Sequence, residues 1–286
     1  MLLSFLIIFF VVQGVAFVTL YERHLLGGSQ QRIGPNKVSF LGLVQAIFDG
    51  VKLLKKEQIS PFRASDIYFL FAPAVAFVVM FLEWFVLPYI FGFLTFGFSI
   101  MFFLVLIGFM VYSFLVSGLI SKSKYGYVGG LRASSQSVSY EIAFTLYLLS
   151  IVIHLQMFSF LNSNMLNLFV LQLPFLMMVL AELNRAPFDF TEGESELVSG
   201  YNVEFSSVPF VLLFLSEYGS LLFFSTLFSF MFFDMSLLVI YIMFSILVFI
   251  RSSYPRFRYD MMMNLFWFKL LPLSLIYLWY FFVLIH

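Results

Sequence analysis

The acids of this chain are concentrated in residues 181–205, which hold six of its fifteen carboxylates against one base, Arg185. The six are Glu182, Asp189, Glu192, Glu194, Glu196 and Glu204. The flanking sequence is almost entirely apolar, and a carboxylate in hydrocarbon is costly unless it is paired, hydrated or protonated. This concentration therefore favours a protein that moves protons or cations. The alternative is a solvated acidic loop, because most loops are wet.

Four further acids stand in or beside apolar runs. Glu217 lies inside one, where an ionisable residue indicates function, and Glu141 lies at the start of another. Neighbouring carboxylates in such surroundings share protons and titrate as a coupled set. Glu83 and Asp234 match no motif, so we expect them at the membrane interface.

The composition predicts an integral membrane protein. Of the 286 residues, 62% are hydrophobic and only 10% are charged, whereas soluble domains carry about 25% charged residues. A membrane-spanning helix needs about 20 apolar residues. The apolar runs predict an all-α membrane protein, a bundle of about eight transmembrane helices that forms one multi-pass domain over residues 1–286. We expect the first span to run over Met1–Leu20 and the fourth to open at Ser139, after a polar loop at 122–138.

The first connection is predicted to contain a helix that lies in the membrane interface. Apolar and polar side chains alternate there at helical spacing, which is typical of a helix with one side in the bilayer. The apolar side consists of Val44, Ile47, Phe48, Val51 and Leu54, and the polar side of Gln45, Asp49, Lys52 and Lys56.

The bases indicate an orientation. All fifteen Lys and Arg residues fall at the odd-numbered connections of this eight-span map or beside them. By the positive-inside rule these connections face the cytoplasm or the mitochondrial matrix. Because nearly all polar loops lie on that side, we expect a soluble partner to cover it.

The sequence predicts no electron-transfer centre, metal site or catalytic residue in this chain. It has no cysteine for a thiolate-bound iron–sulfur cluster. Its three histidines (His24, His154 and His286) cannot face one another across a bundle. No nucleotide-binding glycine pattern is present. Electrons for any redox reaction would come from elsewhere.

Four segments together resemble a known family. Residues 22–36, 131–141, 182–200 and 254–260 are similar, in this order, to motifs of the subunit 1 family of proton-pumping NADH:quinone oxidoreductase, respiratory complex I. The acidic segment is long enough to be specific. His24 stands where the family usually has lysine, and Gly28-Ser29 where it has an aromatic residue and methionine. The amino-acid sequences of these motifs are similar to those of mitochondrially encoded members of the family.

The resemblance implies the site and its surroundings. Ubiquinone would be the substrate, entering a tunnel from the bilayer, with Arg23, Arg32, Asp49, Arg256 and Arg258 at its polar rim; phospholipid headgroups are the alternative ligands of these arginines. A path linking quinone reduction to proton translocation would use Glu141, Glu182, Asp189, Glu192, Glu194, Glu196, Glu204 and Glu217.

The resemblance also implies partners and a location. The chain would bind no cofactor alone, because the flavin and iron–sulfur clusters belong to partner subunits. Those partners would be the quinone-reducing subunits of the peripheral arm, on the matrix face, and antiporter-like membrane subunits, with phospholipids but no nucleic acid. The location would be the mitochondrial inner membrane.

Three other functions compete with this one. A membrane-bound hydrogenase base subunit would share the motifs. A proton- or cation-coupled secondary transporter would show an inverted repeat with broken helices, and none is visible. A non-catalytic anchor would explain the one-sided loops but not Glu217 or the acidic segment.

Overall fold

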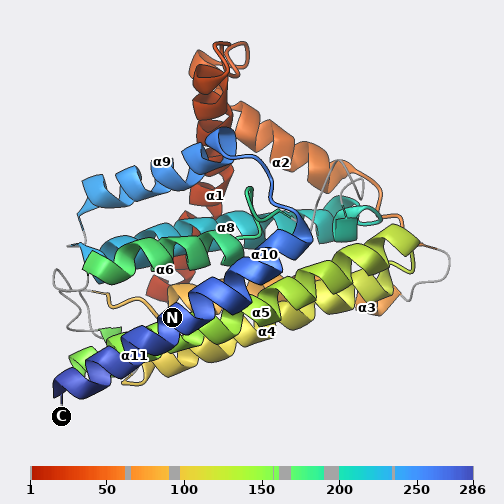
Figure 1. Cartoon of the computed structure of the whole chain (residues 1–286). Helices are drawn as coiled ribbons and strands as arrows, with labels where there is room; N and C mark the ends of the chain where they lie inside the picture. Colours follow the sequence, from red (N-terminus) through yellow and green to blue (C-terminus); the bar gives the residue numbers. More distant parts are fainter. Residues whose placement is uncertain are drawn as a thin grey trace.

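The computed structural model describes residues 2–61, 66–89, 97–156, 158–160, 169–189, 200–233 and 236–285, and its regular structure there is helical throughout. The helices form a bundle whose long axes run mostly side by side (Figure 1). The prediction of an all-α membrane protein is confirmed. In chain order they are α1 (Leu2–Ser29), η1 (Phe40–Gly42), α2 (Gln45–Lys55), α3 (Asp66–Trp84), α4 (Ser99–Ile120), α5 (Lys124–Leu155), α6 (Phe169–Glu182), η5 (Gly200–Asn202), α8 (Ser207–Phe232), α9 (Leu237–Ser253), α10 (Tyr259–Leu265), the π-helical turn η6 (Phe266–Leu270) and α11 (Leu271–Ile285).

Six helices in the described part of the chain are long and apolar enough to cross a membrane. They are α1, α3, α4, α5, α8 and the continuous run of α10, η6 and α11, and two shorter apolar helices correspond to α6 and α9. The chain is therefore a multi-pass membrane protein. The number of about eight spans stays a prediction.

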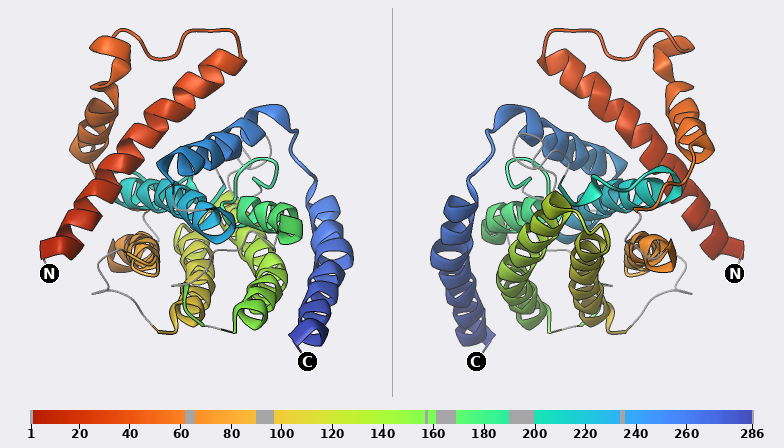
Figure 2. Two further views of the ribbon diagram at one scale, coloured as in Figure 1. Left: turned by 90° about the vertical axis from the view of Figure 1, so that its left-hand side faces the viewer. Right: turned by 90° about the vertical axis from the view of Figure 1, so that its right-hand side faces the viewer.

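The bundle is built around two long helix pairs. α4 packs along α5, and α3 along α8, while α11 covers the other side of α5 (Figure 2). α4 and α5 approach closely where each has a glycine, since a Cβ on Gly130 would stand 2.9 Å from the Cα of Gly118. Small residues allow such approach between helices in a membrane. The space between the pairs holds the buried polar groups described below.

Two predicted boundaries were wrong. The first span was expected to run over Met1–Leu20, but α1 continues to Ser29 and buries Glu22, which is 3% exposed. The predicted polar loop at 122–138 is mostly helical, because α5 begins at Lys124, capped by the Ser123 hydroxyl, which accepts from the Gly126 amide. Its small side chains let it pack closely on its neighbours, so the polar composition did not prevent a helix.

A helix is present in the first connection, as predicted. α2 packs against α1 and α8 (Figure 1), with Ala46 turned inward. The predicted apolar side chains Ile47, Phe48, Val51 and Leu54 are all exposed. This is the pattern expected for an interfacial helix whose apolar side meets lipid.

Candidate functional site

A very small cavity lies between α3, α4, α6 and α8, and three acids line it. Glu83, Glu182 and Glu217 come from three different helices to its wall, and its volume is about 10 Å³. The expectation that Glu83 lies at the interface was wrong, because its side chain is 1% exposed. We call this space the acid cavity.

Beside the acid cavity is a larger space of about 450 Å³, which we call the polar chamber. Its wall is made by the loop after α6, by η5, by α8 and by the end of α9. Glu217 belongs to the walls of both spaces, and the buried Tyr201 hydroxyl donates a hydrogen bond to its Oε1. The wall of the polar chamber therefore contains the charged side chains of Arg185, Arg251 and Asp189 together with the Glu217 carboxyl, which also lines the acid cavity.

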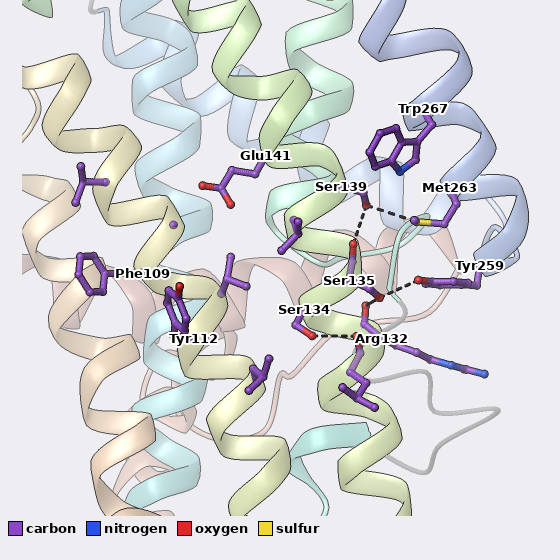
Figure 3. A pocket seen from close by; sticks show the side chains of 16 residues that line it. Phe109, Tyr112, Arg132, Ser134, Ser135, Ser139, Glu141, Tyr259, Met263 and Trp267 are labelled. Atoms are coloured by element: carbon purple, nitrogen blue, oxygen red, sulfur yellow. Dashed lines mark hydrogen bonds between the residues drawn. The ribbon is translucent and has the colours of Figure 1, made fainter.

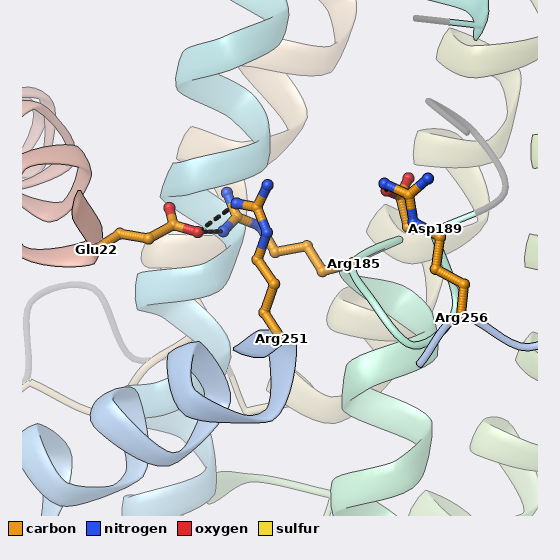
Figure 4. A network of polar contacts seen from close by, with 5 residues as sticks. All are labelled: Glu22, Arg185, Asp189, Arg251 and Arg256. Carbon is orange, nitrogen blue, oxygen red and sulfur yellow. Dashed lines mark hydrogen bonds and ion pairs between the residues drawn. The ribbon is translucent and has the colours of Figure 1, made fainter. Parts of the chain in front are cut away.

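Two arginines of the polar chamber share one buried carboxylate (Figure 4). Glu22 Oε1 accepts from Arg185 Nη1 at 2.9 Å and from Arg251 Nη1 at 2.5 Å. The Arg185 guanidinium also lies 4.1 Å over the centre of the Tyr218 ring, in a cation–π contact. Burial alone would lower the pKa of the Arg185 guanidinium, but the Glu22 carboxylate raises this pKa above its ordinary value, so the arginine stays charged.

The loop that carries Arg185 is held by groups distant in the sequence. The Gln136 side-chain amide of α5 donates to the carbonyls of Phe188, at 3.0 Å, and Ala181, at 3.3 Å. The Phe257 amide donates to the Pro187 carbonyl at 3.0 Å, and nearby Arg256 pairs with Asp189 at 3.1 Å (Figure 4). Residues 187–189 and 256–257, which belong to two of the motif segments, thus meet in space.

A third space of about 420 Å³ opens between α1, α2 and α8, and we call it the entrance cavity. Its wall is largely apolar, with Val15, Ala16 and Leu53 among its residues. At its rim Arg23 Nη1 pairs with Asp49 Oδ2 at 2.9 Å, and both side chains are nearly half exposed. This combination of apolar wall and charged rim suits a molecule with a long apolar tail and a polar head.

The three spaces adjoin one another through shared wall residues. Phe210 and Phe214 of α8 line both the entrance cavity and the polar chamber. Leu183, Asn184 and Glu217 line both the polar chamber and the acid cavity. The three spaces are therefore neighbours, with Phe210 and Phe214 in the wall between the first two.

Glu141 lies on the far side of the acids, in an open groove of about 880 Å³ between α4, α5 and the α10–η6 run (Figure 3). The groove is otherwise mostly apolar, with Trp267 and Met263 opposite α5. Tyr140, the preceding residue, is 2% exposed, hydrogen-bonds to Glu182 and interacts electrostatically with Glu141 and Glu83. The acids thus continue from the polar chamber to an outer surface of the bundle.

The remaining predicted residues lie apart from these spaces. Arg32 is exposed and donates to Gln30 at 2.9 Å, Arg258 is exposed at the start of α10, and Glu204 is half-buried; none of them lines a space described above. Glu192, Glu194 and Glu196 lie outside the described residues. Their proposed roles stay predictions.

Sequence reasoning missed Glu22, Gln136, Tyr201 and the burial of Glu83. Glu22 entered the sequence analysis only as the first residue of the motif 22–36, with no role assigned, and its two partners follow it by 163 and 229 residues. The family departure at His24 has a local explanation, because a Cβ on Gly34 would stand 2.5 Å from His24 Nδ1. The imidazole therefore rests on a glycine, and its Nε2 lies 3.0 Å from the Leu41 carbonyl oxygen.

No group of three or more His, Asp or Glu side chains in the described ranges could hold a metal ion. The fold and the site define a class: a helical multi-pass membrane protein in which buried and half-buried carboxyls lie inside the helix bundle, close to a largely apolar cavity.

Comparison with known proteins specifies the family. A sequence model of the NADH dehydrogenase family matches residues 2–282. The chain is 43% identical over 292 positions to NADH-ubiquinone oxidoreductase chain 1 of Aedes aegypti, covering 97% of this chain and 93% of that protein. It is 44% identical over 287 positions to the protein of the same name from Danio rerio, covering 93% and 89%. The chain belongs to the NADH dehydrogenase family, which confirms the resemblance.

Proposed function

We propose that this chain is the membrane subunit of NADH:ubiquinone oxidoreductase that admits ubiquinone from the bilayer and links its reduction to proton translocation. Family membership supports its place in the complex. The observation that supports the finer role is the series of spaces with shared walls, from the entrance cavity through the polar chamber to the acid cavity. The chain itself would bind no redox cofactor and would work as one multi-pass domain.

The entrance cavity is the proposed path of the quinone tail. Its apolar wall lies beside α2, whose exposed apolar side would meet the bilayer. Such a wall can receive a hydrophobic tail from the bilayer without exposing it to water. The Arg23–Asp49 pair at the rim offers hydrogen bonds to a carbonyl head as it passes. Asp189 would stand further along, in the wall of the polar chamber, with Arg256 paired to it.

The acids are the proposed proton path, in the order Glu217, Glu182 and Glu141. Glu217 faces the polar chamber, Glu182 faces the acid cavity, and Glu141 faces the outer groove. Tyr140 stands between the last two and can donate or accept a proton through its hydroxyl. Because neighbouring carboxyls share protons, a charge change at one end shifts protons along the set.

The proposed location is the mitochondrial inner membrane, with the base-rich connections on the matrix side. The first connection and the loop after α6 would then meet the quinone-reducing subunits there. The outer groove beside Glu141 would face the antiporter-like membrane subunits. Phospholipids would cover the exposed side of α2.

A blocked entrance tests the quinone path. Ala46 lines the entrance cavity and is buried, whereas the next residue, Ile47, is 54% exposed and does not line this cavity. Ala46→Trp should therefore lower ubiquinone reduction while NADH oxidation by a water-soluble acceptor is unchanged. Ile47→Trp is the matched control and should leave both rates unchanged. Equal effects of the two substitutions, or a normal rate in Ala46→Trp, would refute the path.

Neutralising one acid tests the proton path. Glu217→Gln keeps the shape of the side chain but cannot release a proton, so quinone-linked turnover and proton pumping per assembled complex should fall. Glu204→Gln changes a half-buried acid outside the described spaces and should do less. Normal turnover and pumping in assembled Glu217→Gln complex would remove Glu217 from the path.

A further inference from the structure

We propose that Glu83 is a further proton-holding group of this path and that the acid cavity binds one water molecule between Glu83 and Glu182. The inference rests on the proposed proton path and adds a residue to it from α3, which the family motifs do not mark. Glu83 is the only charged residue in 67–121. An acid buried at such a place is costly unless it is satisfied.

The cavity has the size and the chemistry of a water site. Its volume of about 10 Å³ is close to the smallest that holds one water molecule. Three buried oxygens from its lining residues have no hydrogen-bond partner within the described chain: Glu83 Oε2, Glu182 Oε2 and Asn184 Oδ1. All three can accept, so they need donors, and a water molecule supplies two O–H groups. Buried waters satisfy orphaned polar atoms of this kind.

Bases do not neutralise the two acids. No ion pair within 4 Å joins Glu83 or Glu182 to a Lys, Arg or His of the described chain, and the nearby Arg185 is paired with Glu22. Two ionised carboxylates that face one dry cavity would repel each other and lose their hydration. At least one proton must therefore be shared among Glu83, Glu182 and the water.

The packing of α3 fixes Glu83 at this place. One turn earlier, Met80 lies against Gly219 of α8, where an added Cβ would stand 2.5 Å from the methionine sulfur. Trp84, which follows Glu83, makes an edge-to-face ring contact with Phe223 of α8. α3 and α8 pack along each other (Figure 2). The carboxyl therefore cannot reach an aqueous surface without moving the helix.

The proton movement is balanced. The Glu182 carboxyl gives its proton to the water while the water gives one of its own to the Glu83 carboxylate. The water is regenerated and one negative charge moves from Glu83 to Glu182. The titratable groups facing Glu83 are Glu182 on α6, Glu217 on α8 and Tyr140 on α5, whereas α4 contributes Met110 and Phe114. Glu83 can thus hold a proton while these neighbouring groups change their protonation state.

The test uses the assembled complex with Glu83→Gln and measures three quantities: quinone-linked turnover per complex, proton pumping in sealed vesicles, and the infrared difference spectrum on quinone reduction. We expect turnover and pumping to fall about tenfold, which corresponds to about 1.4 kcal/mol. A protonated-carboxyl C=O band that shifts in D₂O should disappear from the spectrum. Glu57→Gln, an exposed acid outside all these spaces, should change none of the three.

The outcomes separate this inference from the proposed path. Loss of the band with lowered pumping in assembled Glu83→Gln complex supports it, and Glu83→Asp should keep a carboxyl band. Unchanged spectrum and pumping in Glu83→Gln, with Glu217→Gln impaired, would overturn the role of Glu83 alone. If Glu217→Gln were also silent, the whole acid path would fail. If the variant assembled poorly but the remaining complex kept the band and full turnover, Glu83 would be structural and the inference wrong.

Discussion

Replacing Glu22 tests how much of the site depends on one buried carboxylate. Glu22→Gln preserves size but removes the negative charge that Arg185 and Arg251 share. Breaking a buried ion pair costs about 3–5 kcal/mol, because a charge is left buried without a partner. The Arg185 side chain is 15% exposed and fits that case. The Arg251 side chain is 43% exposed, so the loss of its pair with Glu22 adds only about 0–1 kcal/mol to the destabilisation by Glu22→Gln.

The chain contains a matched control for this calculation. Arg23–Asp49 has the same N–O distance, 2.9 Å, as Arg185–Glu22, but its side chains are 49% and 43% exposed. Asp49→Asn should therefore cost about 0–1 kcal/mol. The measurement is the temperature at which this chain is lost from the purified complex in detergent. Glu22→Gln should lower it by much more than Asp49→Asn. Equal shifts would refute the reasoning, because burial would then not set the strength of the pairs.

Three further substitutions test the packing and the loop. Gly130→Val should destabilise by about 1–3 kcal/mol through overpacking, since its Cβ would press on Gly118, and heat stability of the complex would show this. Gln136→Leu removes the side-chain donor of the Phe188 carbonyl, whereas the Ala181 carbonyl keeps the Asn184 amide; it should cost about 1–3 kcal/mol and make the loop after α6 more sensitive to protease. Tyr201→Phe removes the hydroxyl that binds Glu217 and should lower pumping more than assembly, which vesicle and native-gel assays would separate.

The sequence predicted the class, the helical spans and the family, because these depend on composition, on periodicity and on local motifs. It also singled out Glu182 and Glu217, which the structure brings to one cavity. The sequence could not show the pairing of Glu22, because its partners come from the loop after α6 and from the end of α9. A local sequence pattern depends only on the residues that are close in the chain. Long-range ion pairs depend on how the helices pack in space, and a local pattern does not predict that packing.

The error at Glu83 has the same origin. Near the end of an apolar run, an acid normally reaches the interface, and sequence reasoning placed this one there. The packing of α3 on α8 instead turns it toward Glu182. Similarly, residues 124–138 look like a loop because they are rich in Gly, Ser and charge. They are helical because α4 and η5 approach so closely that only small side chains fit, as the contact of Gly129 with Gly200 and Tyr201 shows.

The arrangement of charges suggests how quinone chemistry could reach the acids without a direct contact. The polar chamber has two arginines whose charge is only half balanced by Glu22, and it adjoins the acid cavity through Glu217. A reduced quinone in or near the chamber would add negative charge until it took up protons. At an effective dielectric constant of about 20, a unit charge that changes about 10 Å away alters the protonation free energy of a carboxyl by roughly 1.7 kcal/mol. That is more than one unit of pKa, enough to move a shared proton from one carboxyl to its neighbour. The buried acids therefore need only adjoin the chamber, as they do here, to respond to the reaction.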